Sequence, residues 1–362
     1  MKTVFFVLLA SFISFAQADE VSTDAVKLGG AVRFGYAYND DNSDHGGDMK
    51  FDTFRLDVRG KVQGVRVLSK WRWFQTHKAL IQVAEMGYDF SPASSLNAGL
   101  TLVPFGNQEY NSHNFDLSPN FVLGLEDNYQ FGGTYVFNQD GLNVQASFFK
   151  NDSSMAGMST DSYSPTLNTL TYANGSVVDI GGFNMGALRV VQNFSPMDEL
   201  RIELGGSALY GGVWDKTNDS ELGERQAYAL HSSIQWQRVH VQLQATHYDY
   251  ALGAGAKSLG MAYYGGVYNQ IATKAMSYTT NVKYSLPVSL GPIRALDFYN
   301  DYTWVTDKPQ SAPDSSDNAL GMGIAAGAVY VFLDWHRQLN MADMTARTGV
   351  SHYFNANFGY YF

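Results

Sequence analysis

The chain has 362 residues, a formal net charge of −10 at pH 7 and no cysteine, and 14% of its residues are aromatic. The lack of cysteine excludes a disulfide framework, a thiol nucleophile and a cysteine-ligated metal site. The negative charge, without any run of Lys or Arg, argues against nucleic acid as a partner.

The first residues, MKTVFFVLLASFISFAQADE, have the features of a cleavable signal peptide. Lys2 is positive, residues 4–15 are largely apolar, and Ala16-Gln17-Ala18 is a small-x-small cleavage site. The alternative is a membrane anchor, but the apolar run is shorter than the roughly 20 residues that a spanning helix needs. We therefore expect residues 1–18 to be removed and residues 19–362 to form one β-barrel domain.

After this segment, apolar and polar residues alternate with the period of two that is typical of strands. In residues 26–38, for example, Leu28, Val32 and Phe34 share one face. Short and long connections follow one another, as in a series of antiparallel hairpins with turns at one end and loops at the other. One miscounted hairpin would give 14 or 18 strands, but the pattern predicts about 16, at residues 26–38, 50–62, 65–75, 79–90, 95–105, 127–137, 142–150, 180–194, 199–212, 224–237, 239–250, 275–286, 293–306, 317–326, 328–338 and 349–362.

This pattern predicts an all-β fold, a transmembrane antiparallel β-barrel. Counts of 23 Tyr, 23 Phe and 35 Gly suit a barrel with an apolar outside, a polar inside and aromatic girdles. In lipid every backbone amide needs a partner, which a sheet without edges provides. A barrel of about 16 strands is too wide for side chains to fill, so we expect it to enclose a water-filled channel. The closing segment HYFNANFGYYF, which ends at Phe362, resembles the last strand of bacterial outer-membrane barrels.

Two stretches carry a more specific resemblance. Residues 96–115 read LNAGLTLVPFGNQEYNSHNF and are followed by FVLGLEDNYQFGGTYVF at 121–137, while VYVFLDWHRQLN at 329–340 precedes the closing segment. They resemble the phosphate-selective porin O/P family over most of residues 27–362. The resemblance implies a trimeric 16-stranded barrel in the bacterial outer membrane, with a third loop folded into the lumen and a channel for anions or other small polar solutes.

The segment at residues 106–126 occupies the position of that third loop. It departs from a phosphate-selective pattern because it contains no Arg or Lys. We expect this constriction loop to contribute acidic and aromatic side chains to the pore, namely Glu109, Tyr110, Phe115, Asp116 and, just after the segment, Asp127.

The polar face of the first three strands predicts a basic wall inside the pore. An arginine on the lipid face would cost roughly 2–4 kcal/mol near the bilayer midplane, so these side chains should point inward. Rows of arginine facing carboxylates favour anions and orient dipolar solutes. Several of the cations could also pair with Asp57, Glu85 or Asp89 and stiffen the wall. The pore-lining candidates are Arg33, Arg55, Arg59, Arg66, Lys70 and Arg72, with Lys27 and Lys61 on the same face.

Aromatic side chains offer a competing hypothesis, because sugar channels stack sugar rings on such residues. Candidates besides Tyr110 and Phe115 are Tyr263, Tyr264 and Tyr268, although packing within the loops is the simpler interpretation. Trp71, Trp73, Trp236 and Trp335 are expected to be interfacial anchors.

Enzymatic interpretations find little support. There is no HExxH or GxSxG motif, and His240 and His247 lie on opposite faces of one strand. Ser232 points away from His231 on its strand, and Ser233 stands roughly 7 Å further along. The first loop carries several aspartates but lacks a calcium-binding ladder, so a solvated loop is the simpler interpretation.

These observations predict an outer-membrane porin, a passive channel for small polar solutes and ions with weak anion preference, without cofactor, metal or enzymatic activity. Its partners would be outer-membrane lipid and, from the resemblance, two further copies of the chain. The alternatives are a substrate-specific channel for phosphate, organic acids or oligosaccharides, and a plugged barrel serving adhesion or catalysis.

Overall fold

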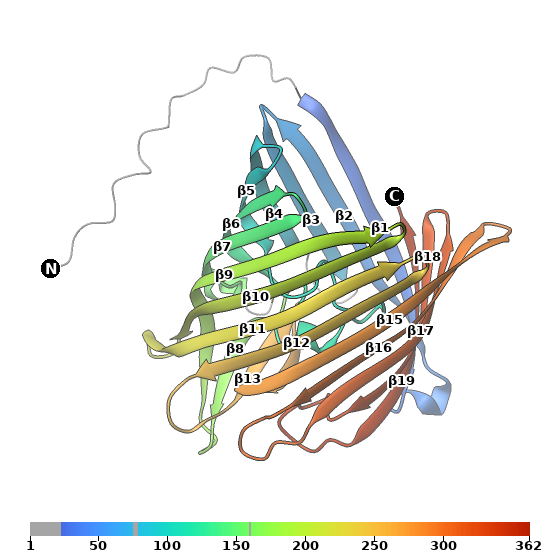
Figure 1. The fold of residues 1–362 in the computed structure, drawn as a ribbon. Helices are drawn as coiled ribbons and strands as arrows, with labels where there is room; N and C mark the ends of the chain where they lie inside the picture. The colour runs from blue at the N-terminus through green and yellow to red at the C-terminus, as the bar shows by residue number, and fades with distance from the viewer. Residues whose placement is uncertain (1–22, 75–78, 159–160) are drawn as a thin grey trace.

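In the computed structural model, which describes residues 23–362 apart from 75–78 and 159–160, the chain folds into a closed antiparallel β-barrel of 16 strands (Figure 1). Residues 1–18, the expected signal peptide, lie outside the described residues. Barrel strands that follow one another along the chain are hydrogen-bonded neighbours, and β1 pairs with β19 to close the sheet.

All 16 strands expected from the alternation are present, including the short one at 317–326. They are β1 (Thr23–Asn39), β2 (Asp48–Val62), β3 (Val65–Phe74), β4 (Ala79–Ser91), β5 (Ser94–Leu102), β6 (Tyr129–Gln139), β7 (Leu142–Asn151), β9 (Val177–Met197), β10 (Leu200–Asp215), β11 (Ser220–Trp236), β12 (Val239–Ala251), β15 (Lys274–Leu290), β16 (Ile293–Thr306), β17 (Ser315–Ala326), β18 (Val329–Leu339) and β19 (Val350–Tyr361). The predicted fold class is confirmed.

Three further strands lie in two long connections, residues 151–179 and 251–274, which the sequence predicted to be loops. They are β8 (Thr166–Tyr172), β13 (Ala256–Tyr263) and β14 (Val267–Ala272), and β13 pairs with both of the others. Helical turns are short: η1 (Ser43–His45), α1 (Pro119–Val122) and η2 (Ser154–Met158). In the described part of the chain, none of the helices is long and apolar enough to cross a membrane.

The outer face of the barrel carries many exposed apolar side chains, and most polar side chains of the strands have the opposite parity. On β1 the exposed side chains include Leu28, Phe34 and Tyr38, which share one parity, whereas Arg33 has the other parity and is directed inward. Trp236 and Trp335 are also exposed.

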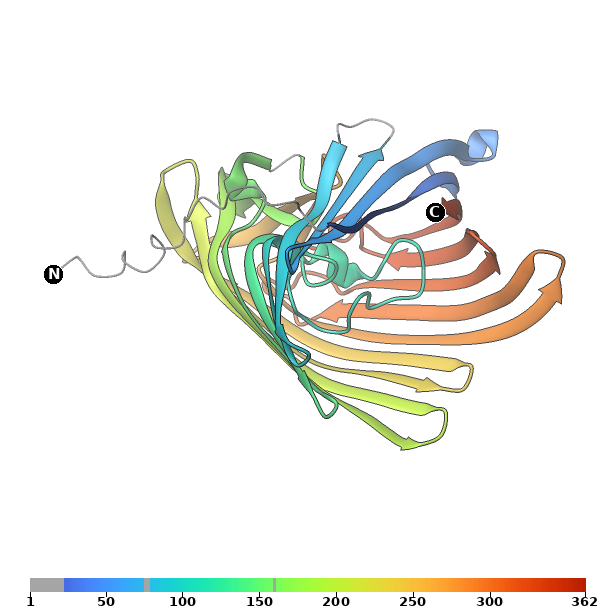
Figure 2. The same cartoon turned by 90° about the horizontal axis from the view of Figure 1, so that it is seen from above.

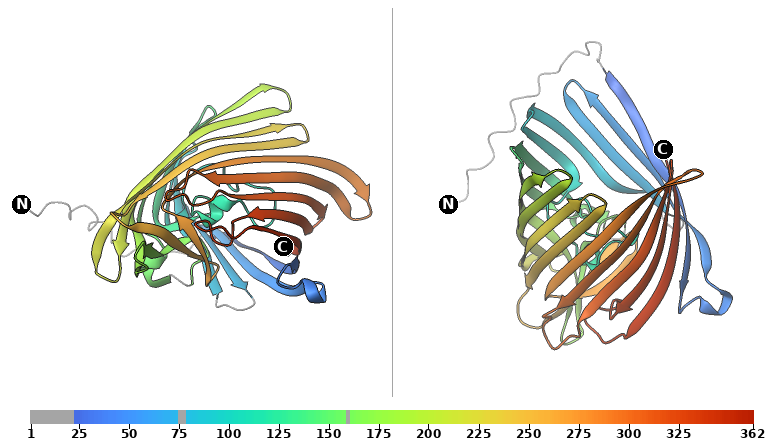
Figure 3. Two further views of the ribbon diagram at one scale, coloured as in Figure 1. Left: turned by 90° about the horizontal axis from the view of Figure 1, so that it is seen from below. Right: turned by 45° about the vertical axis from the view of Figure 1, so that its right-hand side comes forward.

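A hydrophobic core lies inside the barrel rather than between layers. It joins side chains of the long loop 103–128 (Val103, Phe105, Leu123 and Leu125), of the small sheet (Leu167, Leu170, Leu259, Met261 and Ile271) and of inward positions on barrel strands (Ile180, Met185, Val213, Tyr248 and Val305). Viewed from above and from below, the loop with α1 lies within the ring of strands (Figures 2 and 3). The expected water-filled lumen is therefore partly occupied by the protein's own loops.

Barrel closure depends on a close approach at Gly30. The backbone N–H of Gly30 donates to the carbonyl of Phe362 (2.8 Å), and that of Phe362 donates back (3.2 Å). A Cβ atom on Gly30 would lie 2.1 Å from the carbonyl oxygen of Arg55 and 2.8 Å from the ring of Phe362. Only glycine fits where β1 passes between β2 and the end of the chain.

Replacing Gly30 by Val should weaken closure, because the added atoms overlap the backbone of β2 and the cost of such overpacking is about 1–3 kcal/mol. The measurement is the temperature at which the detergent-solubilised barrel loses its compact form on a gel. Gly35→Ala is the matched control on the same strand, since its Cβ would meet only the Asn357 side chain at 3.7 Å. Equal melting temperatures for both variants would contradict this account.

Candidate constriction site

The segment between β5 and β6, residues 103–128 (hereafter L3), crosses the lumen and is held first by β9, β10 and β12. The N–H of Gly106 donates to the Ser207 hydroxyl (3.1 Å), and the N–H of Asn107 donates to Oε1 of Gln244 (2.8 Å). The carbonyl of Gly106 accepts from Nε of Arg189 (2.8 Å). On β12 alternate residues from Gln242 to Tyr250 are buried, because L3 and the other inner loops cover this part of the wall.

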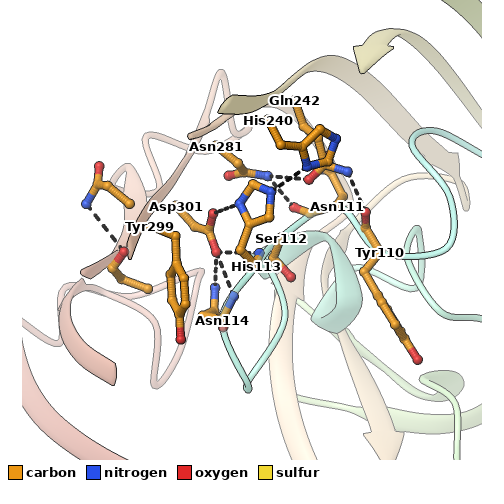
Figure 4. A network of polar contacts seen from close by, with 12 residues as sticks. Tyr110, Asn111, Ser112, His113, Asn114, His240, Gln242, Asn281, Tyr299 and Asp301 are labelled. Carbon is orange, nitrogen blue, oxygen red and sulfur yellow. Dashed lines mark hydrogen bonds and ion pairs between the residues drawn. The ribbon is translucent and has the colours of Figure 1, made fainter. Parts of the chain in front are cut away.

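The centre of L3 is anchored on Asp301 of β16 (Figure 4). Oδ2 of Asp301 accepts from the backbone N–H groups of His113 (2.6 Å) and Asn114 (2.8 Å) and from the Asn114 side chain (2.9 Å), while Oδ1 pairs with Nδ1 of His113 (2.8 Å). Amide side chains of the wall bind neighbouring carbonyls: Gln242 donates to that of Tyr110 (2.9 Å) and Asn281 to that of Asn111 (2.7 Å). A single carboxylate thus fixes the turn of the loop.

The same anchor extends into a chain of hydrogen bonds from Asp301 through two histidines to a serine. Nε2 of His113 lies 2.8 Å from Nδ1 of His240, whose Nε2 lies 2.9 Å from the hydroxyl of Ser233. A second contact joins Ser207 and His231 (3.1 Å). Both contacts run across strands or through L3, so the spacing of serine and histidine along a single strand could not predict them. Both ring nitrogens of His113 and of His240 have hydrogen-bond partners, so neither histidine has a free nitrogen that could act as a base.

The tip of L3 reaches the seam where β18, β19 and β1 meet. The N–H of Phe115 donates to Oδ2 of Asp334 (3.1 Å), and its ring lies under the guanidinium of Arg33 at 4.8 Å. Asp116 accepts from the hydroxyl of Tyr353 (3.0 Å) and lies 3.7 Å from the ring of His336. L3 therefore spans the lumen from the β5–β6 side to β1.

The returning half of L3 is organised around the buried carboxyl group of Glu126. One oxygen accepts from the N–H of Asn111 (2.7 Å), and the other accepts from the N–H (3.2 Å) and hydroxyl (2.5 Å) of Ser118. Ser118 also caps α1, with Pro119 in the first turn. Burial raises the pKa of Glu126 from 4.5 to about 7, although these hydrogen bonds favour the charged form.

Of the other predicted loop residues, Glu109 is exposed and Tyr110 is 39% exposed. Asp127 is buried at the base of L3 and accepts from the hydroxyl of Tyr163 (2.7 Å). Tyr263 and Tyr264 pack against Phe121 of α1, with ring centroids 5.4 and 5.2 Å apart, whereas Tyr268 is exposed. The structure thus places Tyr263 and Tyr264 in loop packing.

Predicted cations of the basic wall lie on adjacent strands and are partly neutralised there. Asp57 pairs with Arg55 (3.1 Å) and Arg59 (3.8 Å), and Asp89 pairs with Arg66 (2.9 Å) and Lys61 (3.9 Å). Those two carboxylates were expected partners.

One partner was missed: Arg33 pairs with Asp52 at 2.6 Å. Asp52 occupies an irregularity in the β1–β2 register, because Arg33 opposes Thr53 and Phe34 opposes Phe51. The extra residue changes the alternation that sequence parity assumes.

The wall is most open toward the short-turn end of the barrel. The side chain of Arg59 is 62% exposed and that of Arg66 is 39% exposed. Lys70 is half-buried, and Arg72 is 5% exposed, because its guanidinium donates to Gln82 (2.8 Å) and is covered by the ring of Tyr163 at 4.8 Å. Three carboxylates thus pair five cations of β1–β3, so these paired groups alone carry two more positive than negative charges.

Comparison with known proteins gives the fold but no sequence family. No family model and no curated protein sequence matches the chain. Among solved structures it is similar to the anion-selective porin from Comamonas acidovorans (TM-score 0.62, 14% identity, 94% of this chain and 100% of that one). It is also similar to the outer membrane protein OmpT of Vibrio cholerae in its trimer form (0.59, 11%, 93% and 99%) and to Pseudomonas putida OprB (0.58, 9%, 93% and 94%).

Asp301→Asn should loosen L3, because an amide nitrogen cannot accept the hydrogen bonds that the carboxylate receives, and each unsatisfied buried group costs about 1–3 kcal/mol. Cleavage of L3 by an added protease should become faster. Asp297→Asn on the same strand is the control, since the hydrogen bond recorded for its side chain comes from Tyr330 of the wall. Cleavage of L3 at the wild-type rate in Asp301→Asn would refute the anchoring role.

L3 should also loosen as the pH rises. The folded pKa of Glu126 lies above its ordinary value, so its contribution to docking is fully present below pH 4.5 and is lost as the pH rises through about 7. We expect Glu126→Gln to remove this dependence, because an amide does not ionise. The measurement is amide exchange in residues 103–128, wild type against variant at the same pH, near about pH 5 and about pH 8.5. If the ratio of the wild-type exchange rate to that of Glu126→Gln is the same at both pH values, the pH-dependent role of Glu126 is refuted.

Proposed function

We propose that the protein is a passive outer-membrane channel for small hydrophilic solutes, with a preference for anions. The observation that carries this proposal is the division of the lumen. Most of L3 and the loop strands β8, β13 and β14 pack against β9–β16, and the tip of L3 reaches β18, β19 and β1. The cations Arg59 and Arg66 of β2 and β3 remain partly exposed on the other side. Solutes that pass the barrel would move along a wall with excess positive charge, which attracts anions.

The apolar outer face supports the membrane location, because a closed sheet of this kind satisfies its backbone hydrogen bonds without water. Residues 1–18 would serve export and be removed. We further propose a trimer, which is the form of the similar Vibrio cholerae protein. A native mass of one barrel in mild detergent would contradict the trimer. Phosphate selectivity is not part of the proposal, since residues 106–126 contain no Arg or Lys.

No catalytic step enters the proposal. Each serine–histidine contact described above also holds L3 or its wall, and in His113 and His240 both ring nitrogens are bound. The arrangement fits a scaffold that fixes a loop better than a nucleophile and its base.

The test is the reversal potential of purified protein in a planar bilayer under a KCl gradient. The double variant Arg59→Gln, Arg66→Gln removes two exposed cations, while Asp57 keeps Arg55 and Asp89 keeps Lys61 as partners. At about 8 Å in water a unit charge contributes roughly 0.5 kcal/mol, so the chloride-to-potassium permeability ratio should fall by a factor of about two or more.

Arg294→Gln is the matched control, because Arg294 is exposed on the outer parity of β16 and donates to the carbonyl of Gly291 (2.7 Å). It should leave the ratio unchanged. An equal ratio in the wild type and the double variant would remove the wall as the source of selectivity, and absence of any current would refute the channel itself.

A further inference from the structure

An open cleft of about 550 Å³ lies where the β17–β18 turn meets the end of β19, and half of its lining residues are aromatic. The lining residues are Gly327, Ala328, Val329, Tyr330, Phe332 and Tyr361. The N–H of Tyr361 donates to the carbonyl of Ala328 (2.8 Å), which ties the two elements together. Phe332 contacts Phe115 of L3 at 5.6 Å between ring centroids, so one lining residue touches the constriction loop.

Glycines let two of these rings lean over the barrel wall. A Cβ on Gly359 would lie 2.6–2.8 Å from ring atoms of Tyr361, and one on Gly323 would lie 2.0 Å from the hydroxyl of Tyr330. Both tyrosines remain half-buried rather than covered. Each ring therefore keeps part of its surface toward the cleft, where a planar or ring-shaped solute can stack on it.

Positive charge borders these rings because β1 pairs with β19. The guanidinium of Arg55 lies 5.9 Å from the ring centroid of Tyr361, and that of Arg33 lies 4.8 Å from Phe115. Their acidic partners are Asp57 and Asp52, and Arg59 extends the row toward the open end. An anionic group on a bound solute would thus meet cations within reach of the aromatic surface.

A buried polar group stands next to Phe332 in the sheet but is not among the residues that line the cleft. Asn357 stands directly opposite Phe332 in the β18–β19 pairing and is 1% exposed, yet its Oδ1 has no hydrogen-bond partner among the described residues. A buried carbonyl oxygen of this kind calls for a donor, such as a hydroxyl group or water.

From this arrangement, and resting on the proposed channel function, we propose that the cleft is a binding subsite for carboxylates attached to a ring. The ring would stack on Tyr361 and Phe332, and the carboxylate would face Arg55. Aryl acids and sugar acids share this chemistry. A small anion lacks the ring and a neutral sugar lacks the charge, so both should bind more weakly.

The experiment is block of the chloride current by four probes: benzoate, glucuronate, glucose and acetate. We expect benzoate, glucuronate or both to block at lower concentration than acetate and glucose, and which of the two acids blocks identifies the source of the ring. Tyr361→Leu should raise the blocking concentration of that acid by about threefold to tenfold, the range expected for loss of an aromatic contact.

Tyr360→Leu is the matched control, because Tyr360 is the adjacent residue on the outer face and is 52% exposed. If Tyr361→Leu fails to assemble, Phe332→Leu tests the same stacking surface. Block by acetate equal to that by the ring acids, or unchanged block in the assembled variant, would overturn the subsite while leaving the channel in place.

Absence of current in the wild type would instead refute the channel. Calorimetric titration of the same probes into the detergent-solubilised protein would then show whether the subsite binds ring acids. Heat of binding for a ring acid that is lost in Tyr361→Leu would support it, and no binding would overturn it.

Discussion

Closure of the sheet between β1 and β19 is the constraint on which the rest of the structure depends. A sheet with a free edge leaves a row of unpaired N–H and C=O groups, which is untenable in hydrocarbon. Here the ladder runs from Ala31–Tyr361 to Asn39–Tyr353 and is extended by the Gly30–Phe362 hydrogen bonds. The absence of a side chain at Gly30 admits both the Phe362 ring and the β2 backbone, so closure rests on one small residue as well as on the ladder.

A closed barrel of this width leaves space that side chains of the wall cannot fill, and the chain fills part of it with loops. L3 is polar along much of its length, so its burial requires partners for its backbone. Asp301, Gln242 and Asn281 supply them from three wall strands, and Glu126 supplies them from within the loop. The hydrophobic core then covers the remaining apolar side chains, which explains why it lies inside the barrel.

The strands could be predicted from sequence because burial on one face of a barrel strand alternates with period two, and this signal is local. The inward orientation of Arg33 and Arg55 follows from the same rule. The rule fails where the register shifts, as at Asp52. The alternation does not predict contacts between distant segments, such as Ser233 with His240 and His113 with Asp301. The loop strands β8, β13 and β14 were not predicted, because they form inside the barrel by packing against L3, and this tertiary contact leaves no local pattern in the sequence.

The way in which L3 is fixed also decides which side of the barrel can face a solute. Its partners on β9–β16 have their polar groups engaged and their surfaces covered, so they contribute rigidity rather than recognition. On the opposite side the tip of L3 contacts β18, β19 and β1 through Phe115 and Asp116, and the more exposed cations lie beyond it on β2 and β3. The aromatic side chains of this part of the wall come from residues 330–361 and its cations from residues 33–66, two parts of the chain that meet only because the barrel closes. Closure therefore does more than satisfy backbone hydrogen bonds, since it places rings and positive charges side by side on one side of the lumen.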